Sequence, residues 1–192
     1  MIKAIIFDCF GVLVTEGWLA FKDQYFGSNE KLANEATDLL KQADSGLLSH
    51  EDFVQAIAKL AQVPAEDVHL SIDNNVPNEP LFAYIAELKP KYKIGMLSNA
   101  AANWLNVLFT PPQLALFDDI SLSYESGFVK PHHGAYEKIA DQIGVKVGDC
   151  IFVDDQIRHC EGARLAGMRA IMYQDFPQLK RDLNTILADS KS

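Results

Sequence analysis

Short apolar runs that end abruptly in a polar residue recur along the chain. The clearest cover residues 4–7, 94–97 and 150–153, and two further candidates cover 120–124 and 170–173. Runs of this length without polar alternation are typical of strands that are buried on both faces, as in a parallel sheet. The pattern therefore predicts a parallel sheet built from these segments.

Helical periodicity marks the segments between these runs. Apolar residues three and four positions apart predict helices that end before Pro90 and before Gly144, and a third over residues 156–166 that ends at Gly167. Glycine at these ends fits the left-handed backbone that often terminates helices. The alternation of strands and helices predicts an α/β fold in which helices flank the parallel sheet.

The interval between the first run and the one at 94–97 is too long for a crossover loop. Apolar residues at helical spacing predict two helices within residues 18–40 and a third after Ser49, which can cap it. We therefore expect residues 15–80 to form a helical cap subdomain above the sheet. The catalytic core is expected to comprise residues 1–14 and 81–192.

Polar side chains that suit phosphoryl transfer follow the predicted strands. Asp8, Ser98 and the pair Asp154 and Asp155 come directly after apolar runs, and Lys130 is assigned to a fourth strand end. Because the carboxyl ends of parallel strands meet at one edge, we expect these side chains to gather there. A carboxylate can attack phosphorus once positive charge neutralises the repulsion between the two anions. Lysine and a magnesium ion held by Asp8 and Asp154 would supply that charge.

Contacts to a phosphate group are expected from the segment after the second strand. The Ser98 hydroxyl can donate to a phosphate oxygen, and the backbone amides of Asn99 and Ala100, at a helix start, can add two more donors. Lys130 would provide a fixed positive charge. The predicted substrate site therefore comprises Ser98, Asn99 and Lys130.

Four motifs occur in an order that resembles the haloacid dehalogenase-like superfamily along nearly the full chain. They are "IIFDCFGVLV", "IGMLSNA", "SGFVKPHHGAY" and "CIFVDDQIRHCEGARLAGM". Each is common alone, but the four together are specific. The resemblance is to a small helical-cap, phosphatase-like subgroup with a D-x-x-G-V-L nucleophile loop. It implies a Rossmann-like core, a four-helix type of cap inserted after the first strand, and an aspartyl-phosphate intermediate.

The resemblance also implies roles for individual residues. Asp8 is the nucleophile, and the magnesium ion is bound by Asp8, the backbone carbonyl of Phe10 and Asp154. Asp155 would act on the metal directly or through water. The implied activity is magnesium-dependent hydrolysis of a small phosphorylated metabolite.

Two positions depart from the superfamily pattern. Phosphatases of the superfamily usually carry a second aspartate two residues after the nucleophile, where this chain has Phe10. Loss of a general acid typically costs on the order of a hundredfold to ten-thousandfold in rate. We therefore predict a preference for good leaving groups, such as aryl, acyl or anomeric sugar phosphates. Arg158 and His159 stand where a carboxylate or asparagine often supports the metal or the lysine.

Three other functions use similar residues. A phosphoacceptor signalling domain carries its acidic pair on the first strand, whereas here Asp8 leads and the pair Asp154 and Asp155 comes last. A haloacid dehalogenase shares the nucleophile and lacks the second aspartate, but displacement of halide from carbon needs no magnesium. A catalytically weak protein that binds phosphate ligands is the third alternative.

Charge and cysteine content narrow the choice of partners and compartment. A formal net charge of −9 disfavours binding to nucleic acid or to an anionic membrane. The early charge at Asp8 argues against a signal peptide, so we expect a soluble, cytoplasmic protein. Three cysteines without paired spacing are expected to be reduced, packed thiols.

Several polar residues are expected to have no catalytic role. Asp118 and Asp119 precede their apolar run, so they should lie at the opposite edge of the sheet. The pairs His132–His133 and His159–Cys160 lack short-spaced partners for a zinc site, so the histidines are interpreted as solvated. Trp18 is interpreted mainly as cap packing.

Overall fold

The structure, a computed structural model, describes residues 1–189 and contains a five-stranded parallel sheet. Its strands are β1 (Ala4–Phe7), β2 (Lys93–Ser98), β3 (Asp119–Leu122), β4 (Cys150–Asp154) and β5 (Arg169–Met172). They lie in the order β3-β2-β1-β4-β5, and every neighbouring pair is parallel. The predicted α/β fold with a parallel sheet flanked by helices is therefore confirmed.

Helices alternate with the strands outside the insert. They are α5 (Glu79–Leu88), α6 (Leu105–Leu108), α7 (Pro111–Leu114), α8 (Ser123–Ser126), α9 (His133–Gln142), the 3-10 helix η1 (Val147–Asp149), α10 (Ile157–Leu165) and α11 (Phe176–Asp189). The three helices predicted around the later strands correspond to α5, α9 and α10. The sequence interpretation did not identify α11, although Leu179, Leu183 and Leu187 form a buried stripe along it.

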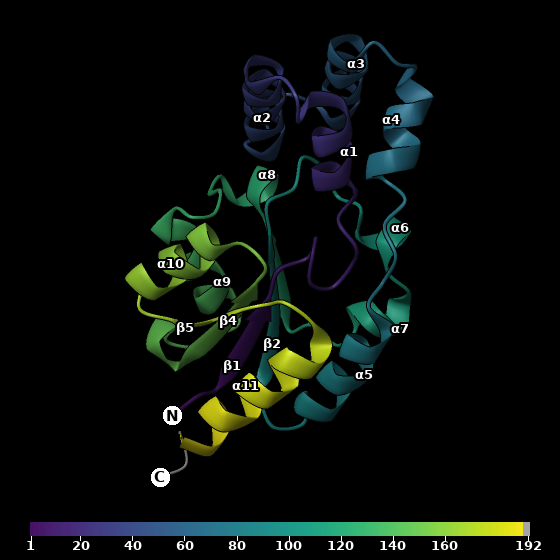
Figure 1. Ribbon diagram of the computed structural model, residues 1–192. Coiled ribbons are helices and arrows are strands. Elements are labelled where there is room, and N and C mark those ends of the chain that lie inside the picture. The colour runs from purple at the N-terminus through teal and green to yellow at the C-terminus, as the bar shows by residue number, and fades with distance from the viewer. Residues whose placement is uncertain (190–192) are drawn as a thin grey trace.

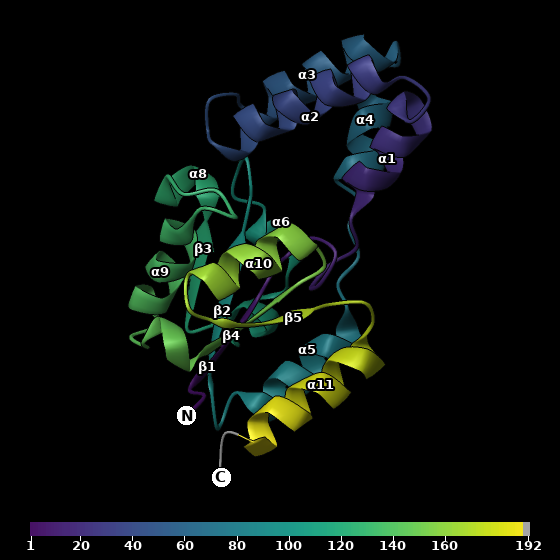
Figure 2. The ribbon, with the colours of Figure 1, turned by 60° about the vertical axis from the view of Figure 1, so that its left-hand side comes forward.

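Both faces of the sheet are covered by helices. Ile5 and Phe7 of β1 belong to one apolar cluster that includes residues of α5 and α11. Ala4 and Ile6 belong to a second cluster with residues of α9 and α10. Figures 1 and 2 show these two pairs of helices on opposite sides of the sheet. Burial on both faces explains why the strands read as continuous apolar runs.

Helices also fill the interval between β1 and α5. They are α1 (Gly17–Phe26), α2 (Glu30–Asp44), α3 (His50–Ala61) and α4 (Ala65–Ile72), called here the insert. The insert has its own apolar cluster around Phe21, Phe53 and Ile57. Ser49 caps α3 by accepting a hydrogen bond from the Asp52 amide, as the sequence suggested. Figure 1 shows the insert above the carboxyl ends of the strands.

All three cysteines, which lie within the described residues, are buried free thiols. Across residues 1–189, no helix has both the length and the apolar character that crossing a bilayer requires.

Asp118 lies at the opposite edge of the sheet from Asp8. Its carboxylate accepts a hydrogen bond from the Ile94 amide at 2.7 Å, near the start of β2, and contacts the ammonium groups of Lys89 at 2.6 Å and Lys93 at 3.0 Å. Burial alone would raise the pKa of Asp118. The Lys89, Ile94 and Lys93 hydrogen bonds outweigh burial and lower that pKa to about 2.

We expect Asp118→Asn to destabilise the fold at neutral pH. A depressed folded-state pKa stabilises the fold above the unfolded value near 4, and this contribution is lost as the pH falls toward 2. Because the carboxylate is close to the surface, the expected loss is about 1 kcal/mol at pH 7. Urea unfolding at pH 7 and pH 3 measures it. A difference that persists undiminished at pH 3 would contradict the assignment, and the exposed Asp23→Asn serves as control.

Candidate active site

A buried lysine joins the ends of two strands. Nζ of Lys130 lies 2.7 Å from Oδ1 of Asp8, just after β1, and 2.8 Å from Oδ2 of Asp154 at the end of β4. None of the three side chains is more than 6% exposed. The structure therefore brings together three of the predicted site residues, which lie far apart in the sequence, at the carboxyl edge of the sheet.

Lys130 reaches this edge from a loop, which differs from the expected strand end. The helix α8 follows β3 directly, and Lys130 lies between α8 and α9. Two hydrogen bonds from Asn99 hold its backbone: the Lys130 amide donates to Asn99 Oδ1 at 2.8 Å, and Asn99 Nδ2 donates to the Lys130 carbonyl at 3.1 Å. The side chain of Asn99 therefore positions the lysine.

The two carboxylates that contact Lys130 have pKa values that are shifted in opposite directions. Burial alone would lower the pKa of Lys130, but the charges of Asp154 and Asp8 outweigh it and raise that pKa, so the ammonium persists. Burial raises the pKa of Asp8, and Asp154 adds to the rise while Lys130 opposes it. For Asp154, the charge of Lys130 and the hydrogen bond with His159 overcome burial and keep the pKa below its ordinary range. Asp8 is thus the group that needs more positive charge nearby to stay ionised.

Asp155 lies against the loop that follows Asp8. Gly11 has φ +82°, and a Cβ atom placed on it would lie 2.5 Å from Oδ2 of Asp155. The other carboxylate oxygen of Asp155, Oδ1, is buried and has no hydrogen-bond partner within residues 1–189. Burial and the charge of Asp154 raise the pKa of Asp155. A buried carboxylate oxygen without a donor is a candidate ligand for a cation.

The donor set fits a hard divalent cation. Asp8, Asp154 and Asp155 provide three carboxylates, and Lys130 neutralises only part of their charge. Magnesium prefers such oxygen ligands. Asp154 is the least available of the three, because its oxygens already accept hydrogen bonds from Lys130 Nζ and the Gln156 amide at 2.8 Å each. Asp155 therefore has a carboxylate oxygen that, among the described residues, is free of such hydrogen bonds and could bind a metal directly.

His159 is buried beside Asp154, so its interpretation as a solvated histidine was wrong. Its Nδ1 atom lies 3.1 Å from both carboxylate oxygens of Asp154. Nε2 is buried and lacks a partner in the described part of the chain. Burial lowers the pKa of His159, which favours the neutral ring. The available signal was its place in the first turn after the acidic pair, where a supporting polar residue is common in the superfamily.

The segment after β2 does not begin a helix. Residues 99–104 are irregular, and α6 starts at Leu105. The Ala100 amide donates to Ser123 Oγ at 3.0 Å, and that hydroxyl in turn donates to the carbonyl of Asp44 in the insert. The Ser98 hydroxyl is buried and donates to the Asn99 carbonyl at 3.2 Å. The predicted phosphate donors at Ala100 and Ser98 are thus engaged within the protein.

A cavity of about 510 Å³ lies between the insert and the carboxyl edge. Of the predicted site residues, it is lined by Asp8, Phe10, Asn99 and Lys130, whereas Ser98, Asp154 and Asp155 do not line it. Large apolar side chains from both the insert and the core dominate its wall, among them Trp18, Leu40, Phe53, Ile72, Trp104 and Leu108. Trp18 therefore both packs in the insert and lines the cavity.

Two acidic residues in this wall escaped the sequence analysis. Burial raises the pKa of Glu16 to about 7 and that of Asp44 to about 6, and both side chains line the cavity. Glu16 precedes α1 and Asp44 ends α2. Acidic residues at helix ends are ordinary surface features in a sequence, so only the three-dimensional arrangement distinguishes these two.

The comparison with family models decides the family. A model described as haloacid dehalogenase-like hydrolase matches residues 2–167. The chain belongs to this family. The resemblance inferred from the four motifs is therefore confirmed, and the residues at the carboxyl edge belong to a haloacid dehalogenase-like hydrolase.

Known proteins similar to this hydrolase include a phosphatase and a dehalogenase. Phosphatase MT3486 of Mycobacterium tuberculosis (strain CDC 1551 / Oshkosh) is 34% identical over 100 residues, which cover 49% of this chain and 46% of the relative. The match thus spans less than half of the relative's own length.

Solved structures share the fold. A family enzyme of Bacteroides thetaiotaomicron, in complex with magnesium and inorganic phosphate, has a TM-score of 0.72 at 20% identity, over 93% of this chain and 99% of that one. L-2-haloacid dehalogenase of Xanthobacter autotrophicus, with chloropropionic acid covalently bound, has a TM-score of 0.64 at 21% identity, over 96% and 83%. At these identities the likeness shows the fold alone.

Proposed function

We propose that this hydrolase cleaves small phosphomonoesters in a magnesium-dependent reaction with Asp8 as the nucleophile. The observation that carries the proposal is the buried Lys130 ammonium between Asp8 and Asp154, beside a cavity that Asp8 itself lines. A buried cation next to a carboxylate prepares the site for an anionic substrate. The phosphatase relative and the neighbour that holds magnesium and phosphate support this choice.

In the proposed reaction an oxygen of Asp8 attacks phosphorus, and the bond to the leaving oxygen breaks. Lys130 offsets the negative charge of the phosphoryl group, while Asn99 holds the lysine backbone in place. Water then cleaves the acyl phosphate and releases inorganic phosphate. A magnesium ion would neutralise further charge. Asp8, the Phe10 carbonyl and Asp155 would hold that ion, with Asp154 acting through Lys130.

The insert would act as the cap of the site. Its residues share the cavity wall with the core, so a phosphorylated metabolite bound there would be enclosed by both. We assign residues 15–78 to this cap and residues 1–14 and 79–189 to the catalytic core, because α5 begins at Glu79, two residues before the boundary expected from the sequence. The buried free thiols suit a reducing compartment such as the cytoplasm.

A phosphate-release assay tests the proposed function. Purified protein is incubated with a panel of phosphorylated metabolites and aryl phosphates, with either magnesium or a chelator. We expect release that requires magnesium. Release unaffected by the chelator would contradict the metal requirement, and halide release from 2-haloacids without phosphate release would favour the dehalogenase alternative.

Phe10 predicts a dependence on the leaving group. Its ring packs edge to face against Trp104, with 5.4 Å between ring centroids, and it offers no proton where a general acid is usual. We expect aryl phosphates to turn over at least about a hundredfold faster than simple alkyl phosphates. Phe10→Asp should raise turnover of alkyl phosphates more than that of aryl phosphates, as measured by kcat/KM.

The matched control for this prediction is Phe10→Asn. Like Phe10→Asp, it removes the aromatic ring. The asparagine side chain has the size of aspartate but carries no acidic group. A gain in alkyl-phosphate turnover that is equal in both variants would show that space, and not proton donation, limits the reaction. Equal rates of the unmodified protein on both substrate classes would contradict the missing-acid argument.

A further inference from the structure

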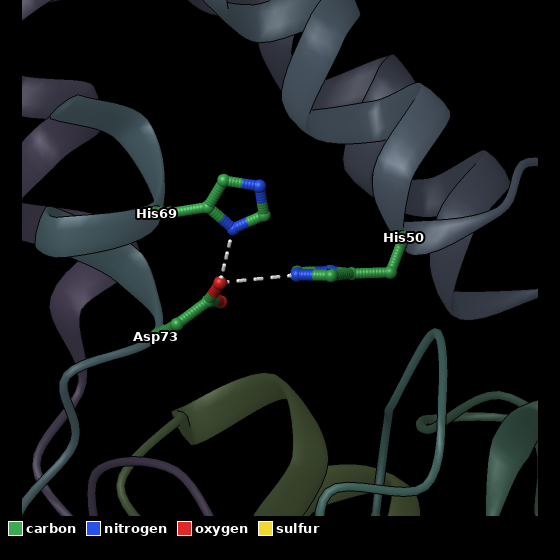
Figure 3. Close-up of side chains that lie close together, drawn as sticks. All are labelled: His50, His69 and Asp73. Atoms are coloured by element: carbon green, nitrogen blue, oxygen red, sulfur yellow. Dashed lines mark hydrogen bonds and ion pairs between the residues drawn. The ribbon is translucent and has the colours of Figure 1, made fainter. Parts of the chain in front are cut away.

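Two histidines and an aspartate of the insert converge on one point. Nε2 of His50 lies 3.2 Å from Oδ2 of Asp73, and Nδ1 of His69 lies 2.6 Å from the same oxygen. Figure 3 shows both rings turned toward this carboxylate. The three candidate ligand atoms lie within 4.8 Å of one another. Nitrogen and oxygen donors at this separation can share a single metal ion.

The helices hold the three side chains in register. His69 and Asp73 lie four residues apart, in α4 and at its C-terminal end, and so face the same side. His50 is the first residue of α3, whose start is fixed by the Ser49 cap. The helices α3 and α4 also pack against each other. The ligand set therefore rests on two helices rather than on loops.

The surroundings of the rings resemble those of metal-bound histidines. Nε2 of His69, the nitrogen that does not face Asp73, lies 3.5 Å from a carboxylate oxygen of Glu51. A histidine that binds a metal commonly donates its other N–H to such a carboxylate, which fixes the ring orientation. The ring of His50 packs edge to face on Trp104 at 5.1 Å between centroids.

We propose that His50 Nε2, His69 Nδ1 and Asp73 Oδ2 bind a zinc ion at the wall of the cavity. Zinc accepts imidazole and carboxylate ligands at about 2.0–2.2 Å, and three protein ligands leave a fourth position open. The 3.2 Å between His50 Nε2 and Asp73 Oδ2 is close to the distance between two ligand atoms in such a tetrahedral shell. The 2.6 Å contact of His69 Nδ1 with the same oxygen would have to lengthen by about 0.7 Å when the ion binds. Because His50 and Asp73 line the cavity, the ion would lie at its wall.

This site is chemically distinct from the one around Asp8. Two imidazoles favour a borderline transition metal, whereas the carboxylates near Lys130 favour magnesium. The two sites share no ligand. Zinc binding at the insert can therefore be tested independently of turnover at Asp8.

Titration of zinc into chelator-treated, full-length protein tests the proposal. We expect one high-affinity zinc ion per chain by calorimetry. We expect His69→Gln and Asp73→Asn each to weaken binding at least about tenfold. Cobalt titrated in place of zinc should give the visible absorption of a tetrahedral site, which a purely structural hydrogen-bond cluster would not produce. The control His133→Gln, an exposed histidine outside the cluster, should bind zinc like the unmodified protein.

The outcomes separate the alternatives. Failure to bind zinc, or binding that both His69→Gln and Asp73→Asn leave unchanged, overturns the proposal. Loss of binding in the double variant Asp8→Asn/Asp155→Asn, with binding retained in His50→Gln, would place the ion at the core and also overturn it. Circular dichroism of each variant confirms folding, and the partial exposure of all three ligands makes misfolding an unexpected result.

Discussion

Asp8→Asn is expected to lower kcat/KM for an aryl phosphate by a factor on the order of a thousand or more. The amide has the size of the carboxylate but cannot attack phosphorus. It also removes one of the two anions that contact Lys130 Nζ, at 2.7 Å, while the contact with Asp154 remains. Steady-state phosphate release with saturating magnesium measures the effect.

The control for Asp8→Asn is Asp119→Asn, because Asp119 begins β3 at the opposite edge of the sheet. That variant should keep full activity. Wild-type rates in Asp8→Asn would remove the nucleophile from the proposed mechanism. Mass spectrometry of acid-quenched enzyme adds a direct test, because a phosphate bound to Asp8 should appear in the unmodified protein and be absent from the variant.

Lys130→Met is expected to cost about 3–5 kcal/mol of folding free energy at pH 7, together with most of the activity. The side chain is only 1% exposed and contacts two buried carboxylates. Methionine fills a similar volume but leaves those carboxylates without their partner. Urea unfolding of the variant and the unmodified protein gives the difference.

The loss of stability in Lys130→Met should depend on pH. Lys130 and His159 hold the pKa of Asp154 below its ordinary value, so the stabilisation is present above about pH 4 and is lost as the pH falls. The difference in the free energy of unfolding between Lys130→Met and the unmodified protein should therefore become smaller as the pH falls. A difference that is larger at pH 4 than at pH 7 would contradict stabilisation by the ion pair. Lys138→Met, at an exposed position of α9, should change stability by less than about 0.5 kcal/mol.

Much of the fold could be predicted because burial leaves a strong trace in the sequence. Strands β1, β2 and β4 lie under helices on both faces, so residues 4–7, 94–97 and 150–153 form runs without a polar side chain between strand ends. The helix α4 was not identified individually, because in eight residues it buries only Val68 among the described side chains. The apolar stripe of α11 is present in the sequence, but it lies after the last of the four motifs and was not interpreted as a helix.

The site residues differ in the same way in how far the sequence predicts them. Asp8 and Asp154 follow buried strands directly, so their position at the carboxyl edge could be predicted. The role of Asn99 could not, because it depends on where the backbone of Lys130 passes. The same holds for the insert cluster of His50, His69 and Asp73, since helices α3 and α4 must pack before the rings meet.

The two chain segments that connect the insert to the core run antiparallel and are hydrogen-bonded to each other. The Thr15 amide donates to the Val76 carbonyl at 3.0 Å, and the Val76 amide donates to Thr15 Oγ1 at 2.9 Å. Asn78, at the end of this pairing, donates from its backbone amide to the Leu13 carbonyl at 2.8 Å. Because the two connections are hydrogen-bonded to each other, the insert is joined to the core through one paired segment rather than through two independent tethers.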